Sequence, residues 1–191
     1  MTSIARLKVT LDEVTPKVTR RLEVPVTMRL SRLHTVLQAV LGWTDSHLYQ
    51  FDFRGVEYGI PDPDWDYHCV DARHASLSRA ITDSETLSFK YFYDRGDGWT
   101  HSIKVEKIEP AFPGLDYPFL LHASGRCPPE DVGGPSGYAE FLEILADPQH
   151  AEYDQTLTWA GGPFDPHFVD TDAIDRKLLD LKPRARKKAV F

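Results

Sequence analysis

The sequence predicts an α+β fold, a single compact domain with a mixed, mainly antiparallel sheet and helices packed on it. Alternating apolar and polar residues predict paired strands in the first 25 residues and in residues 87–108. Apolar residues spaced three and four apart predict helices in residues 28–41 and 138–145. The 191 residues, 41% of them hydrophobic, suffice to bury one sizeable core. We therefore expect one domain over residues 1–181.

A change of period separates the first hairpin from the first helix. Residues 5–11 and 18–24 alternate like half-buried strands, with a turn around Thr15-Pro16. From residue 28 the spacing becomes helical, and Gly42 is placed to end the helix. The apolar face of this helix consists of Leu30, Leu33, Leu37 and Val40. We expect this face to pack on the sheet, because the helix carries too few basic residues to read DNA.

The next segment predicts a short hairpin, a loop and a helical turn. Residues 51–53 and 56–60 flank Arg54-Gly55, a sequence typical of a turn between strands. Residues 61–75 contain two prolines and several Asp and His side chains, which favours a loop. A short helical turn is expected at residues 76–81.

The clearest strand pair lies in the middle of the chain. Residues 87–93 and 99–108 both alternate, and residues 94–98 form a suitable hairpin loop between them. The cross-strand pairs that this hairpin predicts are Tyr93 with Trp99 and Tyr91 with His101, and the core residues are Phe89 and Ile103.

Two helices are predicted in the last third. The first carries Tyr138, Phe141, Leu142 and Leu145 on one face and is ended by Asp147-Pro148. A Gly- and Pro-containing turn at residues 161–166 leads to the second, whose apolar residues are Ile174, Leu178 and Leu181.

The charge is unevenly distributed. The net charge is −7 at pH 7, yet five basic residues lie in the last ten positions, at Lys182, Arg184, Arg186, Lys187 and Lys188. Without them 17 basic residues stand against 29 acidic ones, a balance that repels nucleic acid. We expect residues 182–191 to form a flexible tail, to which any weak contact with nucleic acid is limited.

The sequence also favours a reducing compartment. No apolar run approaches the roughly 18 residues that cross a bilayer, so no membrane partner is expected. The charged N-terminal segment does not resemble a secretory signal. Two cysteines, Cys69 and Cys127, are too few for a disulfide framework, which favours the cytoplasm.

The first candidate site is a nine-residue stretch that ends at His101. Its side chains of interest are Asp94, Arg95, Asp97, Trp99 and His101. Two carboxylates and a histidine could bind a divalent metal or exchange protons. The same Asp and Gly residues also suit a hairpin turn, since Gly reaches positive φ and Asp accepts backbone N–H bonds. His101 could equally be a hydrogen-bonded histidine within the sheet.

The second candidate site is a loop at residues 127–131, just before Gly133-Gly134. Two prolines would hold Cys127, Glu130 and Asp131 rigidly toward a pocket or a metal. The structural alternative is that the two carboxylates stabilise the following helix through its dipole. A lone cysteine is a weak zinc signal, and no neighbouring base identifies it as a nucleophile.

We expect the two candidate sites to converge, because both concentrate Asp, Gly and Pro in loops beside regular elements. At least one side chain among Asp94, Asp97 and His101 should then lie close to the 127–131 loop. Carboxylates gathered there would need a partner, which could be a metal, an arginine (Arg95 or Arg126) or backbone N–H donors.

A series of motifs runs through most of residues 4–181. They are Arg20-Arg21 between Pro16 and Pro25, Leu33-His34 through Gly42-Trp43 to His47-Leu48, Tyr93-Asp94 through Trp99 to His101, Cys127 through Gly133-Gly134 to Gly137-Tyr138, and Phe164-Asp165-Pro166 with Phe168. In this order they resemble the plasmid ORF-three-like family, first described from an Ri plasmid. Its relatives are named as insertion-element passenger proteins or resolvases.

The resemblance implies a compact α+β domain in a bacterial cytoplasm, and it implies no established activity. The chain departs from the family pattern at Arg95, where relatives carry an apolar side chain, and at Val132, where many carry a cysteine. A thiolate-rich metal site is therefore not expected.

Two classes of function remain open. The first is a non-enzymatic binding or regulatory module of mobile-element type, which uses the groove between the two loops and no cofactor. The second is a metal-assisted hydrolase or nuclease whose divalent metal is held by members of the set Asp94, Asp97, His101, Glu130 and Asp131. A recombinase is disfavoured, because the acidic body offers no basic surface with clustered arginines.

Overall fold

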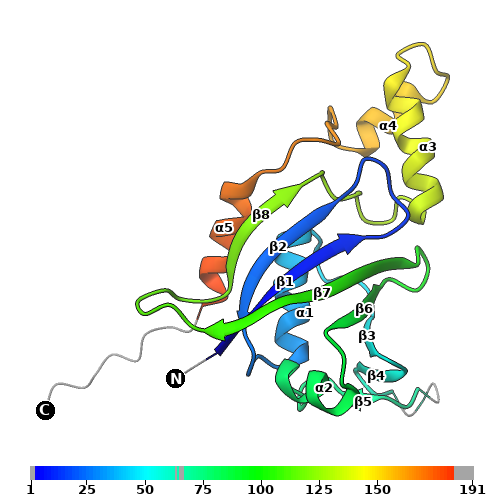
Figure 1. The fold of residues 1–191 in the computed structure, drawn as a ribbon. Helices are drawn as coiled ribbons and strands as arrows, with labels where there is room; N and C mark the ends of the chain where they lie inside the picture. Colours follow the sequence, from blue (N-terminus) through cyan, green and yellow to red (C-terminus); the bar gives the residue numbers. More distant parts are fainter. Residues whose placement is uncertain (1–2, 63, 65–66, 183–191) are drawn as a thin grey trace, which may run out of the picture.

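A computed structural model describes residues 3–62, 64 and 67–182 as one compact α+β domain (Figure 1). Its eight-stranded sheet has the order β5-β4-β3-β6-β7-β1-β2-β8. The strands are β1 (Ser3–Leu11), β2 (Thr19–Pro25), β3 (Tyr49–Phe53), β4 (Val56–Gly59), β5 (Val70–Asp71), β6 (Ser88–Tyr93), β7 (Trp99–Pro110) and β8 (Phe119–Ser124). All pairs among these described strands are antiparallel except β4 with β5. The predicted fold class is confirmed.

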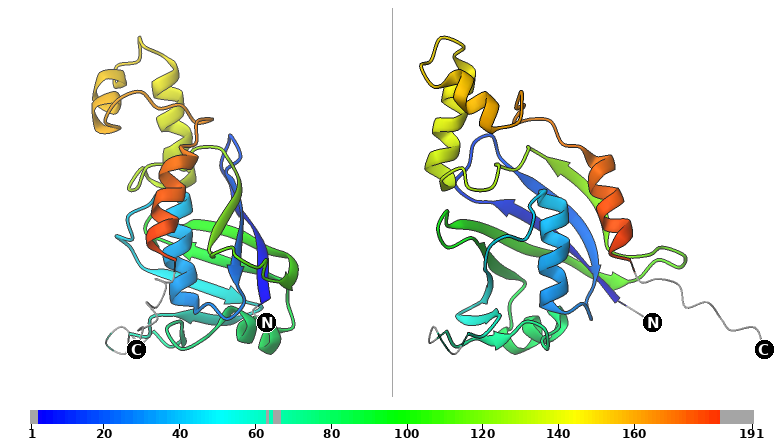
Figure 2. Two further views of the ribbon diagram at one scale, coloured as in Figure 1. Left: turned by 90° about the vertical axis from the view of Figure 1, so that its left-hand side faces the viewer. Right: turned by 180° about the vertical axis from the view of Figure 1, so that it is seen from behind.

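The described helices are α1 (Leu30–Leu41), α2 (Leu77–Ser84), α3 (Gly134–Ala146), α4 (Tyr153–Trp159) and α5 (Thr171–Asp180). Two of them, α1 and α5, cover one face of the sheet (Figure 2). The two views of Figure 2 show α1 and α5 side by side on this face, whereas α3 and α4 project together beyond the end of the sheet. The predicted apolar face of α1 is fully buried, and Gly42 ends the helix in the left-handed conformation with φ 94°.

The opposite face of the sheet is polar. Ion pairs run across its strands, between Arg6 and Glu23 at 2.7 Å and between Arg21 and Glu106 at 2.8 Å. The alternation of apolar and charged residues in β1 and β7 therefore separates the core from an open, charged surface.

Both predicted central hairpins are confirmed. In the first, β1 pairs with β2. In the second, β6 pairs with β7 in the expected register, with Tyr91 opposite His101 and Phe89 opposite Ile103. The short β3–β4 hairpin is confirmed as well, and Arg54-Gly55 supplies its turn with positive φ at both residues.

Several expectations were incomplete. The loop expected at residues 61–75 contains β5, and the short turn expected after it is the helix α2, capped by the Ser76 side chain. Helix α3 begins at Gly134, four residues earlier than predicted. Strand β8 and helix α4 were not predicted, because neither shows a clean apolar period; most residues of both remain at least partly exposed.

The expectation of a basic tail falls mainly on residues 183–191, which lie outside the described residues. Across the described part of the chain, every helix is too short or too polar to cross a bilayer.

Candidate functional site

Turn chemistry positions Asp94 directly after β6. Its backbone has φ 56°, its carbonyl accepts a hydrogen bond from the Gly98 N–H at 2.7 Å, and its Oδ1 accepts one from the Gly96 N–H at 2.8 Å. The structural interpretation of this aspartate is therefore correct. It leaves Oδ2 available, on a side chain that is only 9% exposed.

The turn between β6 and β7 meets the loop before α3, and the expected approach to the 127–131 loop is made by Asp94, whose carboxylate has an oxygen within 4.8 Å of one of Asp131. The Gly133 N–H donates to Asp97 Oδ2 at 3.2 Å. Gly134 comes so close that a Cβ atom there would lie 2.3 Å from the Asp97 carbonyl oxygen. Glycine is thus required at this position, both for φ 70° and for the close approach of two backbones.

His47 lies between two carboxylates at this junction. Its Nε2 is 3.1 Å from Asp131 Oδ1 and 3.6 Å from Asp94 Oδ2. The three potential ligand atoms lie within 4.8 Å of one another. The sheet register explains this placement: Tyr49 pairs with Tyr93, so the residues just before β3 lie beside the residue just after β6.

His47 was not among the predicted site residues. The available signals were its position two residues before β3, in the polar segment that follows Gly42, and its place in the motif that runs from Gly42-Trp43 to His47-Leu48. Among the described residues, the histidine in reach of Asp94 and Asp131 is thus His47 instead of the expected His101. Asp97 and Glu130, also expected as metal ligands, are not part of this group.

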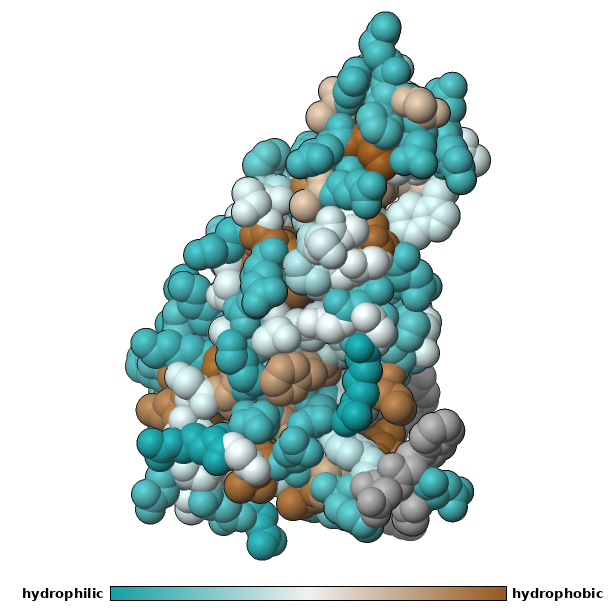
Figure 3. Space-filling model, turned by 90° about the vertical axis from the view of Figure 1, so that its right-hand side faces the viewer, coloured by the Kyte–Doolittle hydropathy of each residue, from teal (hydrophilic) through white to brown (hydrophobic). Residues whose placement is uncertain are grey.

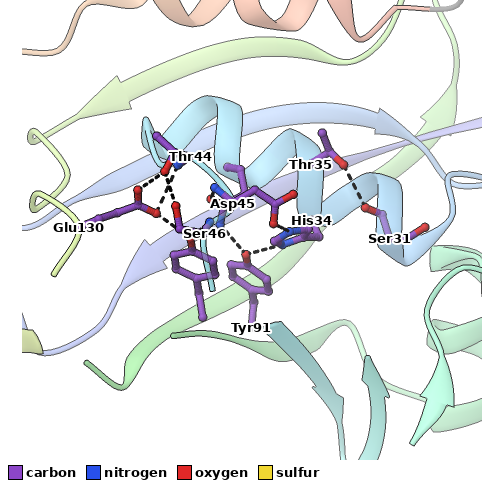
Figure 4. A network of polar contacts seen from close by, with 10 residues as sticks. Ser31, His34, Thr35, Thr44, Asp45, Ser46, Tyr91 and Glu130 are labelled. Carbon is purple, nitrogen blue, oxygen red and sulfur yellow. Dashed lines mark hydrogen bonds and ion pairs between the residues drawn. The ribbon is translucent and has the colours of Figure 1, made fainter. Parts of the chain in front are cut away.

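Glu130 binds neighbouring residues instead. Its Oε1 accepts hydrogen bonds from the Tyr93 hydroxyl at 2.6 Å and from the Thr44 N–H at 3.3 Å, and its Oε2 accepts one from the Thr44 hydroxyl (Figure 4). Burial raises the pKa of Glu130, but these hydrogen bonds outweigh burial and the pKa lies below its usual value. Glu130 is therefore an ionised anchor that ties its loop to the end of α1.

A second polar network fixes the same segment from the other side. His34 Nε2 lies 2.6 Å from Asp45 Oδ1, and His34 Nδ1 lies 2.7 Å from the Tyr91 hydroxyl (Figure 4). Gln38 closes the ring by donating to the Tyr91 hydroxyl and accepting from the Asp45 N–H. Burial lowers the pKa of His34 despite its contact with Asp45, so the neutral ring can donate to the carboxylate and accept from Tyr91. This network holds the residues that lead to His47.

His101 is a core residue. Its ring is fully buried, and its Nδ1 lies 3.1 Å from the Tyr91 carbonyl oxygen, to which it can donate. The ring meets the Trp43 indole edge-on at a centroid distance of 5.3 Å, and Nε2 has no hydrogen-bond partner among the described residues. Burial lowers the pKa of His101 to about 4, so the ring is neutral at pH 7. The interpretation of His101 as a histidine held in the sheet is correct.

Cys127 is similarly withdrawn from solvent. Burial raises the pKa of its thiol to about 12, although the nearby Arg20 acts in the opposite direction. A protonated thiol is a poor nucleophile and a poor metal ligand. The geometry therefore gives no support to either chemical role of Cys127.

Arg95 was expected to be able to neutralise a carboxylate of the site, but it lies elsewhere. Its guanidinium lies over the Tyr67 ring at 4.9 Å and donates to Gln50 Oε1 at 3.3 Å. Trp99, the remaining candidate, is a core side chain 1% exposed and packs beside Trp43. Within the described part of the chain, Arg95 forms no ion pair with Asp94 or Asp131.

Two cavities flank the junction. One, of about 560 Å³, is lined by Asp94, Arg95 and Trp99, together with residues of β3. The other, of about 530 Å³, lies between the C-terminal end of α1, the 127–131 loop and α5.

On the side of the molecule that Figure 3 presents, hydrophobic surface is broken into small areas within a mostly hydrophilic surface.

The second cavity has a buried cation in its wall. Arg20 is 2% exposed and donates to four backbone carbonyl oxygens, those of Val40 at 2.6 Å, Thr19 at 2.8 Å, and Ser124 and Gly125 at 3.0 Å each. Its guanidinium has no carboxylate within ion-pair distance among the described residues. Trp43 also lines the cavity and donates to the Pro128 carbonyl oxygen at 3.0 Å.

Fold and site together define a class of protein. It is an α+β fold with helices on one face of the sheet, in which three loops meet at a carboxylate-rich junction. The chain belongs to the family of plasmid pRiA4b ORF-3-like proteins, whose family model matches residues 3–173. The family indicated by the order of the motifs is therefore confirmed.

Two relatives extend this assignment. The uncharacterised protein y4hQ of Sinorhizobium fredii (strain NBRC 101917 / NGR234) is 52% identical over 188 residues, which cover 98% of this chain and 96% of that protein. A crystal structure of a protein of unknown function, MM3350 from Methanosarcina mazei Go1, is similar with a TM-score of 0.82 and 34% identity. The match covers 90% of this chain and 97% of that chain.

Proposed function

We propose that the protein is a non-enzymatic binding module that takes a small organic anion into the cavity between α1, the 127–131 loop and α5. The observation that carries this proposal is the Arg20 guanidinium, a buried cation whose hydrogen bonds to described residues all go to carbonyl oxygens. A buried charge is costly without an opposite charge, so this wall favours an anionic guest.

The other charged side chains of the cavity also favour an anionic ligand. Arg126 and Lys177 line it as further cations, against Glu130 and Asp170. Both acids already accept hydrogen bonds from the protein, Glu130 from the Tyr93 hydroxyl and Asp170 from the N–H of Ala173 at 2.8 Å. Aromatic walls come from Trp43, Phe164 and Phe168. A volume of about 530 Å³ lies within the usual range for small-molecule sites.

Binding is favoured over catalysis at this cavity because two of the predicted chemical groups, the His101 imidazole and the Cys127 thiol, are withdrawn from solvent. His101 is buried and neutral, and Cys127 is buried and protonated. The compartment that we propose is the cytoplasm, where the free thiols of Cys69 and Cys127 would persist.

Calorimetric titration with benzoate, citrate and inorganic phosphate tests the proposal, with benzyl alcohol as the neutral match for benzoate. We expect saturable binding of at least one anion, no binding of the alcohol, and at least fivefold weaker affinity in Lys177→Ala. The control is Lys104→Ala, which removes a lysine from the open face of the sheet and should leave the affinity unchanged. Absence of binding by all three anions at millimolar concentration would refute the proposal, as would equal affinities of the two lysine variants.

A further inference from the structure

We infer that His47, Asp94 and Asp131 form a binding site for one divalent transition-metal ion, such as Zn²⁺ or Mn²⁺. The site is separate from the proposed anion cavity, whose lining includes none of these three residues. One imidazole nitrogen and two carboxylate oxygens form a ligand set that suits such ions, and three protein ligands leave coordination positions open.

The spacing of the ligand atoms fits one metal ion. Two ligands, each about 2.0–2.2 Å from a tetrahedral metal, lie roughly 3.3–3.5 Å from each other. His47 Nε2 lies 3.1 Å from Asp131 Oδ1 and 3.6 Å from Asp94 Oδ2, values that bracket this range. All three ligand atoms lie within 4.8 Å of one another.

Two of the three ligand atoms, His47 Nε2 and Asp94 Oδ2, have no hydrogen bond to a described residue. His47 Nε2 is inaccessible to solvent and has no hydrogen-bond partner among the described residues. Asp94 has a side chain 9% exposed, and its Oδ2 accepts no hydrogen bond from any described residue. Buried polar atoms are nearly always satisfied by a partner. A cation shared by both atoms would satisfy them and would offset the repulsion between the two carboxylates.

The three ligands come from three separate segments. His47 lies in the connection from α1 to β3, Asp94 in the turn after β6, and Asp131 in the loop before α3. A metal ion would therefore cross-link segments that are distant in sequence, and its binding should raise the stability of the folded state.

The test starts with the full chain, made metal-free by dialysis against a chelator. Calorimetry and elemental analysis should find one Zn²⁺ or one Mn²⁺ bound per chain, and Zn²⁺ should raise the melting temperature. His47→Gln and Asp131→Asn should each weaken binding at least thirtyfold and abolish the rise in melting temperature. Asp131 is 72% exposed, so its substitution should leave the fold intact, which circular dichroism will verify.

Two controls make the result specific. His74→Gln changes an exposed histidine that also lies near a carboxylate, with 3.8 Å between His74 Nε2 and Asp71 Oδ2, and it should leave metal affinity unchanged. Lys177→Ala should not affect metal binding either, which keeps this test distinct from that of the anion cavity. The inference is overturned if the wild-type protein binds neither ion at micromolar concentration, which would leave His47 as an ion-pair partner only. It is equally overturned if Asp131→Asn binds Zn²⁺ as tightly as wild type.

Discussion

Acidification should destabilise this protein through His101, and the structure gives the size of the effect. Burial lowers the pKa of His101 to about 4 in the folded state, whereas an unfolded histidine has a pKa of about 6.5. Between these two pH values the unfolded chain binds a proton that the folded protein excludes, so stability rises with pH and is lost as the pH falls from 6.5 toward 4. For a change from pH 7 to pH 4.5 the two pKa values give a loss of about 2.4 kcal/mol.

The measurement is urea-induced unfolding at both pH values, on the wild type and on His101→Phe. Phenylalanine preserves an aromatic ring in the core but cannot take up a proton. The free energy of unfolding should therefore fall by about 2.4 kcal/mol less in the variant than in the wild type over this pH interval. Contributions from other groups, including the buried His34, occur in both proteins and cancel. Equal pH dependence of the two proteins would refute the reasoning and would mean that His101 is accessible to protons in the folded state.

Three further predictions address the core, the junction and the thiol. Leu37→Ala should lower the free energy of unfolding by about 2–5 kcal/mol, because the side chain is fully buried; an unchanged melting temperature would contradict that burial. Gly134→Ala should cost about 1–3 kcal/mol more than Gly161→Ala in chemical denaturation. Both glycines have φ near 70°, but only the first would bring a Cβ against a backbone, at Asp97; equal costs would disprove the close approach. Cys127, whose pKa burial raises to about 12, should resist iodoacetamide at pH 8 in the folded protein, and full alkylation by mass spectrometry would count against this environment.

The local elements were predictable because their signals are local. The alternation in β6 and β7, joined by a short loop, determined both the strands and their register, down to Tyr91 opposite His101. The apolar face of α1 and the glycine that ends it were determined in the same way. Strand β8 escaped prediction because it is an edge strand with most residues at least partly exposed, and such a strand needs no regular apolar pattern.

The candidate site could be predicted only in part. The sequence alone indicated that the turn at Asp94 and the loop at Asp131 carry the unusual residues, and the order of its motifs indicated the family. The side chains themselves were interpreted less well. Nothing local separates a histidine that lies inside the sheet, such as His101, from one that faces a carboxylate, such as His47.

The family, the fold class and the central hairpins were thus determined by the sequence, through period, turn residues and motif order. Only the tertiary structure decided which histidine joins the carboxylates. Pairing β3 with β6, and Tyr49 with Tyr93 in particular, places the residues before one strand beside the turn after the other. The close approach of Gly134 to Asp97 then adds the third segment. Contacts of this kind depend on the order of strands in the sheet, which the spacing of residues along a single strand does not encode.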